Sequence, residues 1–160
     1  MIDGDLMKKI LYMIFIIIWM MIIFIFSNQP ADDSTKLSDG FIETTIGNVY
    51  QIFNHDVTEE KLFEIKSKYS HPVRKLAHFT IYLILGILVI LLVKEYPLGM
   101  KKIILISLFI CFLYACSDEV HQLFVLGRSG EFRDVLIDTS GSFIGILLFN
   151  RIYKSIHGIM

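Results

Sequence analysis

Charged and hydrogen-bonding side chains lie near one end of three strongly hydrophobic segments of this chain. The three groups are Arg74, Lys75, His78 and Tyr82; Asp118, Glu119 and Gln122; and Arg128, Arg133, Asp134 and Asp138. An ionisable group inside a membrane helix costs about 2.5 to 3.5 kcal/mol on insertion scales, so it is retained where it finds a partner or serves a function. Residues three or four apart share a helix face, so each group forms a stripe. We expect the stripes to meet in one pocket near one face of a membrane.

The cations in these groups predict binding of an anion at the level of the lipid headgroups. They are Arg74, Lys75, Arg128 and Arg133. Arginine binds phosphate and carboxylate with two parallel hydrogen bonds. The anions available there are phospholipid phosphates, the pyrophosphates of lipid-linked precursors and peptide carboxylates. We predict that Tyr82, Gln122 and Asp138 complete the ligand-binding set.

Two side chains are candidates for proton transfer, because both titrate near neutral pH once buried. These are His78 and Glu119, and Asp118 and Asp134 would orient them in a catalytic set. Two other interpretations stay open. The same residues could bind an anion without turnover, or form a structural network in which Lys75 pairs with Glu119 and Arg133 with Asp134.

Potential metal ligands are present, but no H-x-x-x-H or H-E-x-x-H pattern accompanies them. We therefore predict no metal site and no cofactor. His121 falls between the faces set by Asp118 and Gln122, so we expect it to point towards the membrane interface. The polar residues gather towards one side, which does not favour a continuous transport pathway.

The composition indicates an integral membrane protein with a single domain, residues 1–160. Hydrophobic residues make up 54% of the 160 residues, 19% are charged, and the mean hydropathy is +0.61. A soluble protein of this size could not bury so much apolar surface. The formal net charge of −1, without a basic stripe, argues against a nucleic-acid partner. Cys111 and Cys116 lie on different sides of one predicted helix and are poor candidates for a disulfide.

Four segments are long and apolar enough to form an all-α bundle of transmembrane helices. Their approximate bounds are 9–26, 73–93, 102–126 and 133–151. Pro72 fits the first turn of the second. Gly141 and Gly145 form a G-x-x-x-G pattern in the fourth, which predicts close helix packing. Trp19 is interpreted as a lipid contact.

The segment between the first two membrane helices, residues 27–72, is predicted to be an outer loop containing two short helices. Apolar residues recur at helical spacing from Leu37 to Phe53 and predict the first. Asp56 and Glu59 resemble a capping box that opens the second. We expect this loop to lie along the membrane surface.

The distribution of charge around the first helix predicts a cytoplasmic N-terminus. Lys8 and Lys9 precede that helix, while Asp32 and Asp33 follow it. Four crossings return the C-terminus to the same side. The polar stripes then share one layer below the outer face.

These residues carry a resemblance to a known family. Four segments carry it: the sequence from Lys75 through His78 and Tyr82 to Gly86; Asp118-Glu119-Val-His-Gln122; Gly127-Arg128; and Asp134 with Asp138, Gly141 and Gly145. Together they resemble the VanZ-like family. The Phe26-Ser-Asn-Gln-Pro30 segment is also similar. The position of Asp138 is often asparagine in that family, which implies hydrogen bonding there.

The resemblance implies a small protein of the bacterial plasma membrane, named for an accessory factor in resistance to the glycopeptide teicoplanin. It implies no particular reaction. We expect a protein that recognises, and in one alternative modifies, an anionic or lipid-linked cell-envelope molecule at the outer leaflet. Expected partners are membrane lipids or a lipid-linked cell-wall precursor, and a homo-oligomer is compatible with the sequence.

Overall fold

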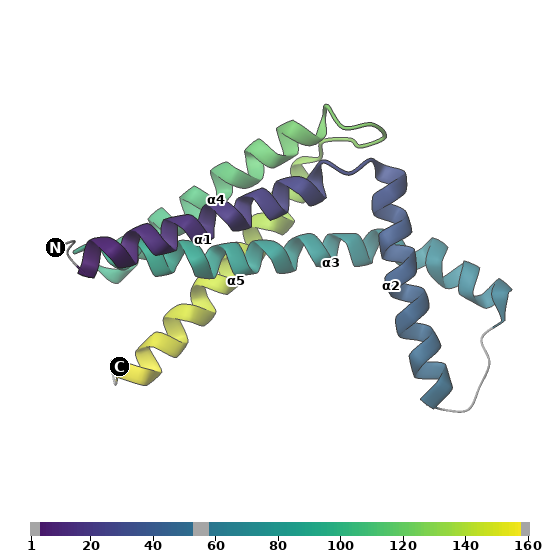
Figure 1. The fold of residues 1–160 in the computed structure, drawn as a ribbon, viewed down its shortest axis with the longest axis horizontal. Helices are drawn as coiled ribbons and strands as arrows, with labels where there is room; N and C mark the ends of the chain where they lie inside the picture. The colour runs from purple at the N-terminus through teal and green to yellow at the C-terminus, as the bar shows by residue number, and fades with distance from the viewer. Residues whose placement is uncertain (1–3, 53–57, 158–160) are drawn as a thin grey trace.

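The computed structural model describes residues 4–52 and 58–157, and this part of the chain consists of helices joined by turns, without strands. Five helices follow one another, as Figure 1 shows: α1 (Gly4–Ser27), α2 (Ala31–Ile52), α3 (Glu59–Val93), α4 (Met100–Gln122) and α5 (Phe132–His157). The predicted all-α fold is confirmed. α1, α4 and much of α3 run alongside one another, α5 crosses them obliquely, and α2 lies across α3 (Figure 1).

Four of the helices, α1, α3, α4 and α5, are long and apolar enough to cross a membrane. Large apolar side chains such as Ile17, Leu105 and Phe109 point outwards on them, as expected when the surrounding solvent is lipid. The predicted set of four membrane helices is therefore confirmed, with shifted ends. α4 stops at Gln122 rather than at residue 126, and α5 continues to His157.

The prediction of a separate short helix before the second membrane helix is wrong. α3 runs without interruption for 35 residues and contains Pro72 in its interior. Proline removes one backbone donor and crowds the preceding turn. Contacts with α2 stabilise the turns before Pro72 and offset this cost. Lys66 Nζ lies 2.5 Å from Glu43 Oε2, and Ser70 donates to Asp39. Thr58 occupies the N-cap position; the predicted cap residue Asp56 lies outside the described residues.

The first predicted amphipathic helix corresponds to α2. It spans 22 residues, with Asp32 and Asp33 in its first turn, where acidic groups favour the helix dipole. Ile42 is buried, whereas Leu37 and Phe41 are largely exposed. Phe53, also predicted for this helix, lies outside the described residues. α2 thus presents apolar side chains beyond those that it packs against α3.

Close contact between α3 and α5 depends on glycines. A Cβ added to Gly145 would lie 2.1 Å from the Leu83 carbonyl oxygen, and one on Gly141 would lie 2.3 Å from that of Phe79. From the other side, a Cβ on Gly86 would lie 2.3 Å from the Ser142 carbonyl oxygen. Only glycine permits this approach, so the packing role predicted for the G-x-x-x-G pattern is confirmed.

Two aromatic side chains attach α1 to the bundle through backbone carbonyls. Trp19 Nε1 donates to the Ile81 carbonyl of α3 at 2.8 Å, and the Tyr114 hydroxyl of α4 donates to the Met20 carbonyl at 2.6 Å. Trp19 therefore also packs against the bundle, beyond the lipid contact that the sequence predicted, because its indole N–H requires an acceptor inside the membrane. Cys111 and Cys116 are both free, as predicted.

Candidate functional site

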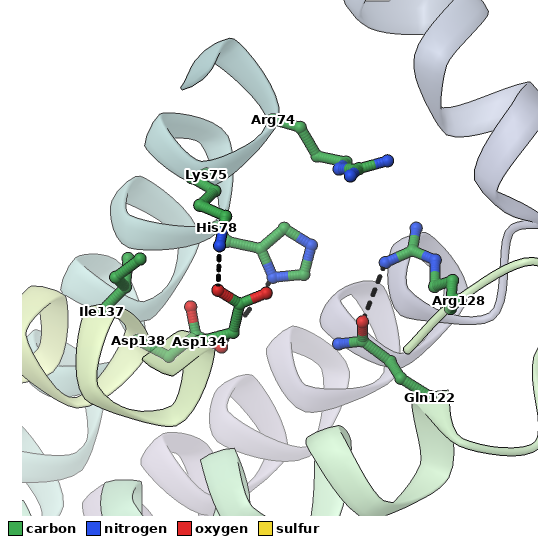
Figure 2. Close-up of a pocket in the computed structure, with 8 residues that line it drawn as sticks. All are labelled: Arg74, Lys75, His78, Gln122, Arg128, Asp134, Ile137 and Asp138. Carbon is green, nitrogen blue, oxygen red and sulfur yellow. Dashed lines mark hydrogen bonds and ion pairs between the residues drawn. The ribbon is translucent and has the colours of Figure 1, made fainter. Parts of the chain in front are cut away.

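Three helices and a loop place polar side chains around one small cavity at the end of the bundle where α4 ends and α5 begins (Figure 2). The cavity has a volume of about 30 Å³, enough for one or two water molecules. It is lined by Arg74, Lys75, His78, Gln122, Arg128, Asp134, Ile137 and Asp138. Most of the residues that the sequence singled out therefore meet, although they come from segments far apart in the chain.

His78, Asp118 and Asp138 lie close together, and we call them the buried cluster. One potential ligand atom from each lies within 4.8 Å of the others. His78 Nδ1 is 3.8 Å from Asp138 Oδ2. Asp118 is 3% exposed and Asp138 is 1% exposed. Two buried carboxyl groups and a partly buried imidazole thus lie close together.

Only one of the two carboxylate oxygens of Asp118 accepts hydrogen bonds from the described residues. Ser27 Oγ donates to Asp118 Oδ2 at 2.8 Å, and Gln122 Nε2 lies 3.3 Å from the same oxygen. Asp118 Oδ1 is buried and has no hydrogen-bond partner among the described residues. Ser27 was not predicted as a site residue. Its position in the Phe26-Ser-Asn-Gln-Pro30 segment, which the family resemblance includes, was the available signal.

Lys75 forms the ion pair at the rim of the cavity. Its ammonium group contacts the Asp134 carboxylate and lies 3.8 Å from Glu131 Oε2. The predicted pairs of Lys75 with Glu119 and of Arg133 with Asp134 are not formed. The glycine contacts bring α3 and α5 together and place Asp134 opposite Lys75. Arg133 is exposed on α5 and does not line the cavity.

Arg128 closes the cavity from the loop between α4 and α5. Its Nε donates to the Gln29 carbonyl at 2.9 Å, Nη1 to Gln122 Oε1 at 3.0 Å, and Nη2 to the Phe26 carbonyl at 3.3 Å. All three acceptors are uncharged. Burial, followed by the nearby Arg74 charge, lowers the pKa of the Arg128 guanidinium from its usual value. An arginine nevertheless stays cationic at neutral pH, so its charge remains without a directly bound anion.

Arg74 lies beside the same cavity and is half-buried (Figure 2). Its guanidinium makes no hydrogen bond or ion pair with any residue that the structure describes. Arg74 and Arg128 repel each other, as the lowered pKa of Arg128 reflects. Two arginine charges therefore flank one cavity, and neither forms an ion pair with a carboxylate of the described residues.

Comparison with known proteins agrees with the resemblance noted in the sequence. A family model described as VanZ/LLP1 matches residues 12–153, which is nearly the whole chain. The chain belongs to the VanZ/LLP1 family. No curated protein and no solved structure gives a significant match.

Glu119 of this VanZ/LLP1 protein lies apart from the cavity. Its Oε1 accepts a hydrogen bond from the Glu131 backbone N–H at 2.7 Å, just before α5 begins, and its Oε2 is buried without a partner in the described chain. A carboxylate is favourable at this end of a helix. The predicted proton-transfer residues His78 and Glu119 thus have different neighbours, and His78 faces Asp138.

Two further residues that the sequence analysis discussed make aromatic contacts. Tyr82 is fully buried and packs 6.0 Å from Tyr114, ring centre to ring centre, while its hydroxyl lacks a hydrogen-bond partner in the described ranges. His121 lies outside the cavity, as expected from its position between faces. Its ring packs on Phe24, and its Nε2 is 3.2 Å from Asn28 Oδ1.

A larger, apolar groove adjoins the cavity between α2 and α3. Its volume is about 480 Å³. The side chains that line it are predominantly apolar and include Leu37 and Phe41 of α2 and Leu76 and Ile81 of α3. Arg74 and His78 line both the groove and the polar cavity. In this family member, the polar cavity therefore continues into an apolar groove.

Proposed function

We propose that this VanZ/LLP1 protein binds an anionic lipid of the cell envelope, either a phospholipid or a lipid-linked cell-wall precursor. The phosphate lies at the mouth of the cavity between Arg74 and Arg128, and the hydrocarbon chain lies in the groove between α2 and α3. One observation carries the proposal: Arg74 and His78 belong to both the polar cavity and the apolar groove.

The charges at the cavity mouth support an anion as the headgroup. Arg128 donates only to uncharged acceptors, and Arg74 has no partner in the described part of the chain. Half-buried guanidinium groups that repel each other are stabilised when an anion binds between them. Phosphate suits this position because arginine binds it with paired, charge-assisted hydrogen bonds. The cavity itself admits only water-sized groups, so we place the phosphate at its mouth.

The groove supports a lipid rather than a free phosphate. Its volume of about 480 Å³ lies within the range of small-molecule pockets, and its lining is mainly apolar. Ser34 and Ser38 of α2 supply a few polar groups near one wall. α2 lies across α3 (Figure 1), so we propose that it covers part of the bound chain at the membrane surface.

Binding is favoured over the two alternatives that the sequence left open. A purely structural network would pair Arg74 with an acid, but the structural ion pair is instead that of Lys75 with Asp134. Catalysis by His78 and Glu119 would require both at the cavity, and Glu119 is engaged by the α5 end. The proposed function is therefore lipid binding without bond cleavage.

We further propose that the cavity lies at the outer leaflet of a bacterial plasma membrane, with both termini in the cytoplasm. Lys8 and Lys9 at the start of α1 support this orientation. Single cysteines introduced at Ser129 and Ser155, with Cys111 and Cys116 replaced by alanine, test it in intact cells. A membrane-impermeant thiol reagent should label position 129 and not position 155. The opposite labelling would reverse the topology.

The binding proposal is tested with purified protein in nanodiscs. Native mass spectrometry and tryptophan fluorescence would measure binding of phosphatidylglycerol, phosphatidylcholine and undecaprenyl pyrophosphate. We expect Arg74→Gln to weaken binding of the two anionic lipids by about tenfold, the equivalent of one charge-assisted hydrogen bond. Arg151→Gln, which changes an exposed arginine outside the cavity and groove, is the matched control and should bind normally.

Stability distinguishes a binding role from a structural role. Arg74→Gln should leave the unfolding temperature unchanged or raise it, because the repulsion from Arg128 is removed. Equal binding of anionic and zwitterionic lipids, or normal binding by Arg74→Gln, would refute the proposal. A large loss of stability in Arg74→Gln would instead support the structural network.

A link to glycopeptide resistance belongs to this proposal as well. If the bound lipid determines how a lipophilic glycopeptide engages the membrane, deletion of the gene should increase susceptibility to teicoplanin more than to vancomycin. Complementation with the wild type should restore resistance, and complementation with Arg74→Gln or His78→Ala should not. An unchanged minimum inhibitory concentration of both drugs after deletion would exclude the link.

A further inference from the structure

We propose that His78, Asp118 and Asp138 bind one divalent metal ion of the zinc or manganese class. This site goes beyond the proposed lipid binding and does not depend on it. α3, α4 and α5 contribute one residue each, and a potential ligand atom from each lies within 4.8 Å of the other two. Imidazole nitrogen and carboxylate oxygen are ligands that both metals accept.

Unpartnered oxygen atoms provide the independent evidence for a bound cation. Asp138 is 1% exposed, and neither of its carboxylate oxygens has a hydrogen-bond partner in the described residues. Asp118 Oδ1 is in the same situation. A buried carboxylate oxygen without a hydrogen bond is destabilising unless a cation compensates its charge. A divalent cation between the two aspartates would neutralise both charges and occupy the free oxygens.

Three cations line the adjoining cavity; two of them are engaged elsewhere, and Arg74 forms no ion pair with either aspartate among the described residues. Lys75 pairs with Asp134 and lies near Glu131, and Arg128 donates to two backbone carbonyls and Gln122. The positively charged form of His78 would offer one charge, 3.8 Å from Asp138 Oδ2. One imidazolium does not balance two aspartates.

The hydrogen bonds around Asp118 have the arrangement found around metal ligands. Ser27 Oγ and Gln122 Nε2 both approach Asp118 Oδ2, which leaves Oδ1 free to bind an ion. Partners of this kind orient a ligand and are a regular part of metal sites. The orienting groups come from α1 and α4, so an ion would connect all four membrane helices.

The three candidate ligand atoms lie somewhat farther apart than in a bound state. Ligand atoms about 2.0 to 2.2 Å from an ion lie about 3.3 to 3.6 Å from one another in tetrahedral geometry. The observed limit of 4.8 Å therefore requires side-chain movements of about 1 Å, which rotation about side-chain bonds can supply. Three protein ligands leave at least one position open for water or an anion. His78 and Asp138 line the small cavity that Arg74 and Arg128 flank, so the open position would face that cavity.

The test is metal binding by the full chain in detergent, without any lipid ligand. After chelation and removal of the chelator, Zn²⁺ or Mn²⁺ is added, excess ion is removed, and the metal content is measured by mass spectrometry together with the unfolding temperature. We expect one ion per chain and a higher unfolding temperature. Asp138→Asn and His78→Ala should lose the ion, whereas His121→Ala, which changes a partly buried histidine outside the cluster, should retain it.

Measuring the stability of each variant without metal shows whether loss of the ion is due to misfolding. Without metal, Asp138→Asn should be at least as stable as the wild type, because it removes a buried carboxylate whose oxygens accept no hydrogen bond in the described residues. With metal bound, the wild type should be more stable than Asp138→Asn. Absence of a stoichiometric ion in the wild type, or equal binding by Asp138→Asn and His78→Ala, would overturn the proposal. Arg74→Gln should retain the ion, so failure of lipid binding and failure of metal binding are separable.

Discussion

The Leu83 carbonyl oxygen lies 2.1 Å from the point that a Cβ on Gly145 would occupy, closer than a carbon atom can approach. This contact holds α3 and α5 at backbone distance. His78 is found on α3 five residues before Leu83, and Asp138 is found on α5 seven residues before Gly145. The glycine contacts therefore determine the separation of two residues of the buried cluster.

Replacement of Gly145 tests this relationship. The obstructing atoms in Gly145→Ala belong to backbone, so the helices must separate, and we expect a loss of about 1 to 3 kcal/mol in the free energy of unfolding. Gly47→Ala on α2 is the control, because a Cβ there meets nothing within 4 Å. Gly47→Ala should be neutral or stabilising by up to about 1 kcal/mol, because alanine favours the helix more than glycine does. Equal stability of the two variants in a denaturant titration would contradict the proposed contact.

Several features of the fold could be predicted because they depend on local pattern. Long apolar segments indicate membrane helices by length alone. The spacing of three or four residues placed His78 and Tyr82 on one face of a helix, and the G-x-x-x-G pattern indicated the surface of α5 that meets α3. Convergence of the stripes then followed from the cost of leaving charges in lipid.

Other features depend on how the helices are rotated and spaced, which no local pattern determines. Lys75 pairs with Asp134 rather than Glu119 because α3 meets α5 closely and the Glu119 carboxylate accepts from the start of α5. Pro72 does not end a helix because α2 packs on the preceding turns. The three candidate metal ligands come from three helices, so no sequence motif joins them.

The ion pair of Lys75 with Asp134 should couple α3 to α5. Both side chains are partly buried, at 18% and 29% exposure. A double-mutant cycle with Lys75→Gln and Asp134→Asn should give a coupling energy of about 0.5 to 1.5 kcal/mol, above the usual value for an exposed pair. The cycle is measured by unfolding in detergent at low and high salt. Additive effects of the two substitutions would show that the pair contributes no interaction energy.

Ser27 should matter through Asp118. Ser27→Ala removes the 2.8 Å hydrogen bond to Asp118 Oδ2 and leaves a buried carboxylate with fewer donors, so we expect a loss of about 1 to 3 kcal/mol. Ser117→Ala is the control on α4, since the exposed Ser117 hydroxyl bonds only to the carbonyl of Tyr114. If the metal site exists, Ser27→Ala should also weaken metal binding, because a ligand loses its orienting group. Normal stability and normal metal affinity would rule out an orienting role.

Gly127 sets the path of the loop that carries Arg128. Its φ of +74° lies in the left-handed region, and a Cβ there would lie 3.2 Å from the Cβ of Ala31, whose N–H donates to the Leu126 carbonyl. We expect Gly127→Ala to cost about 1 to 2 kcal/mol and to weaken anionic-lipid binding by displacing Arg128. Gly127→Asn places the same Cβ, but asparagine tolerates the left-handed conformation better, so its loss should be smaller. If both variants lose equal stability, crowding against Ala31 dominates, and if neither does, the loop conformation does not determine the position of Arg128.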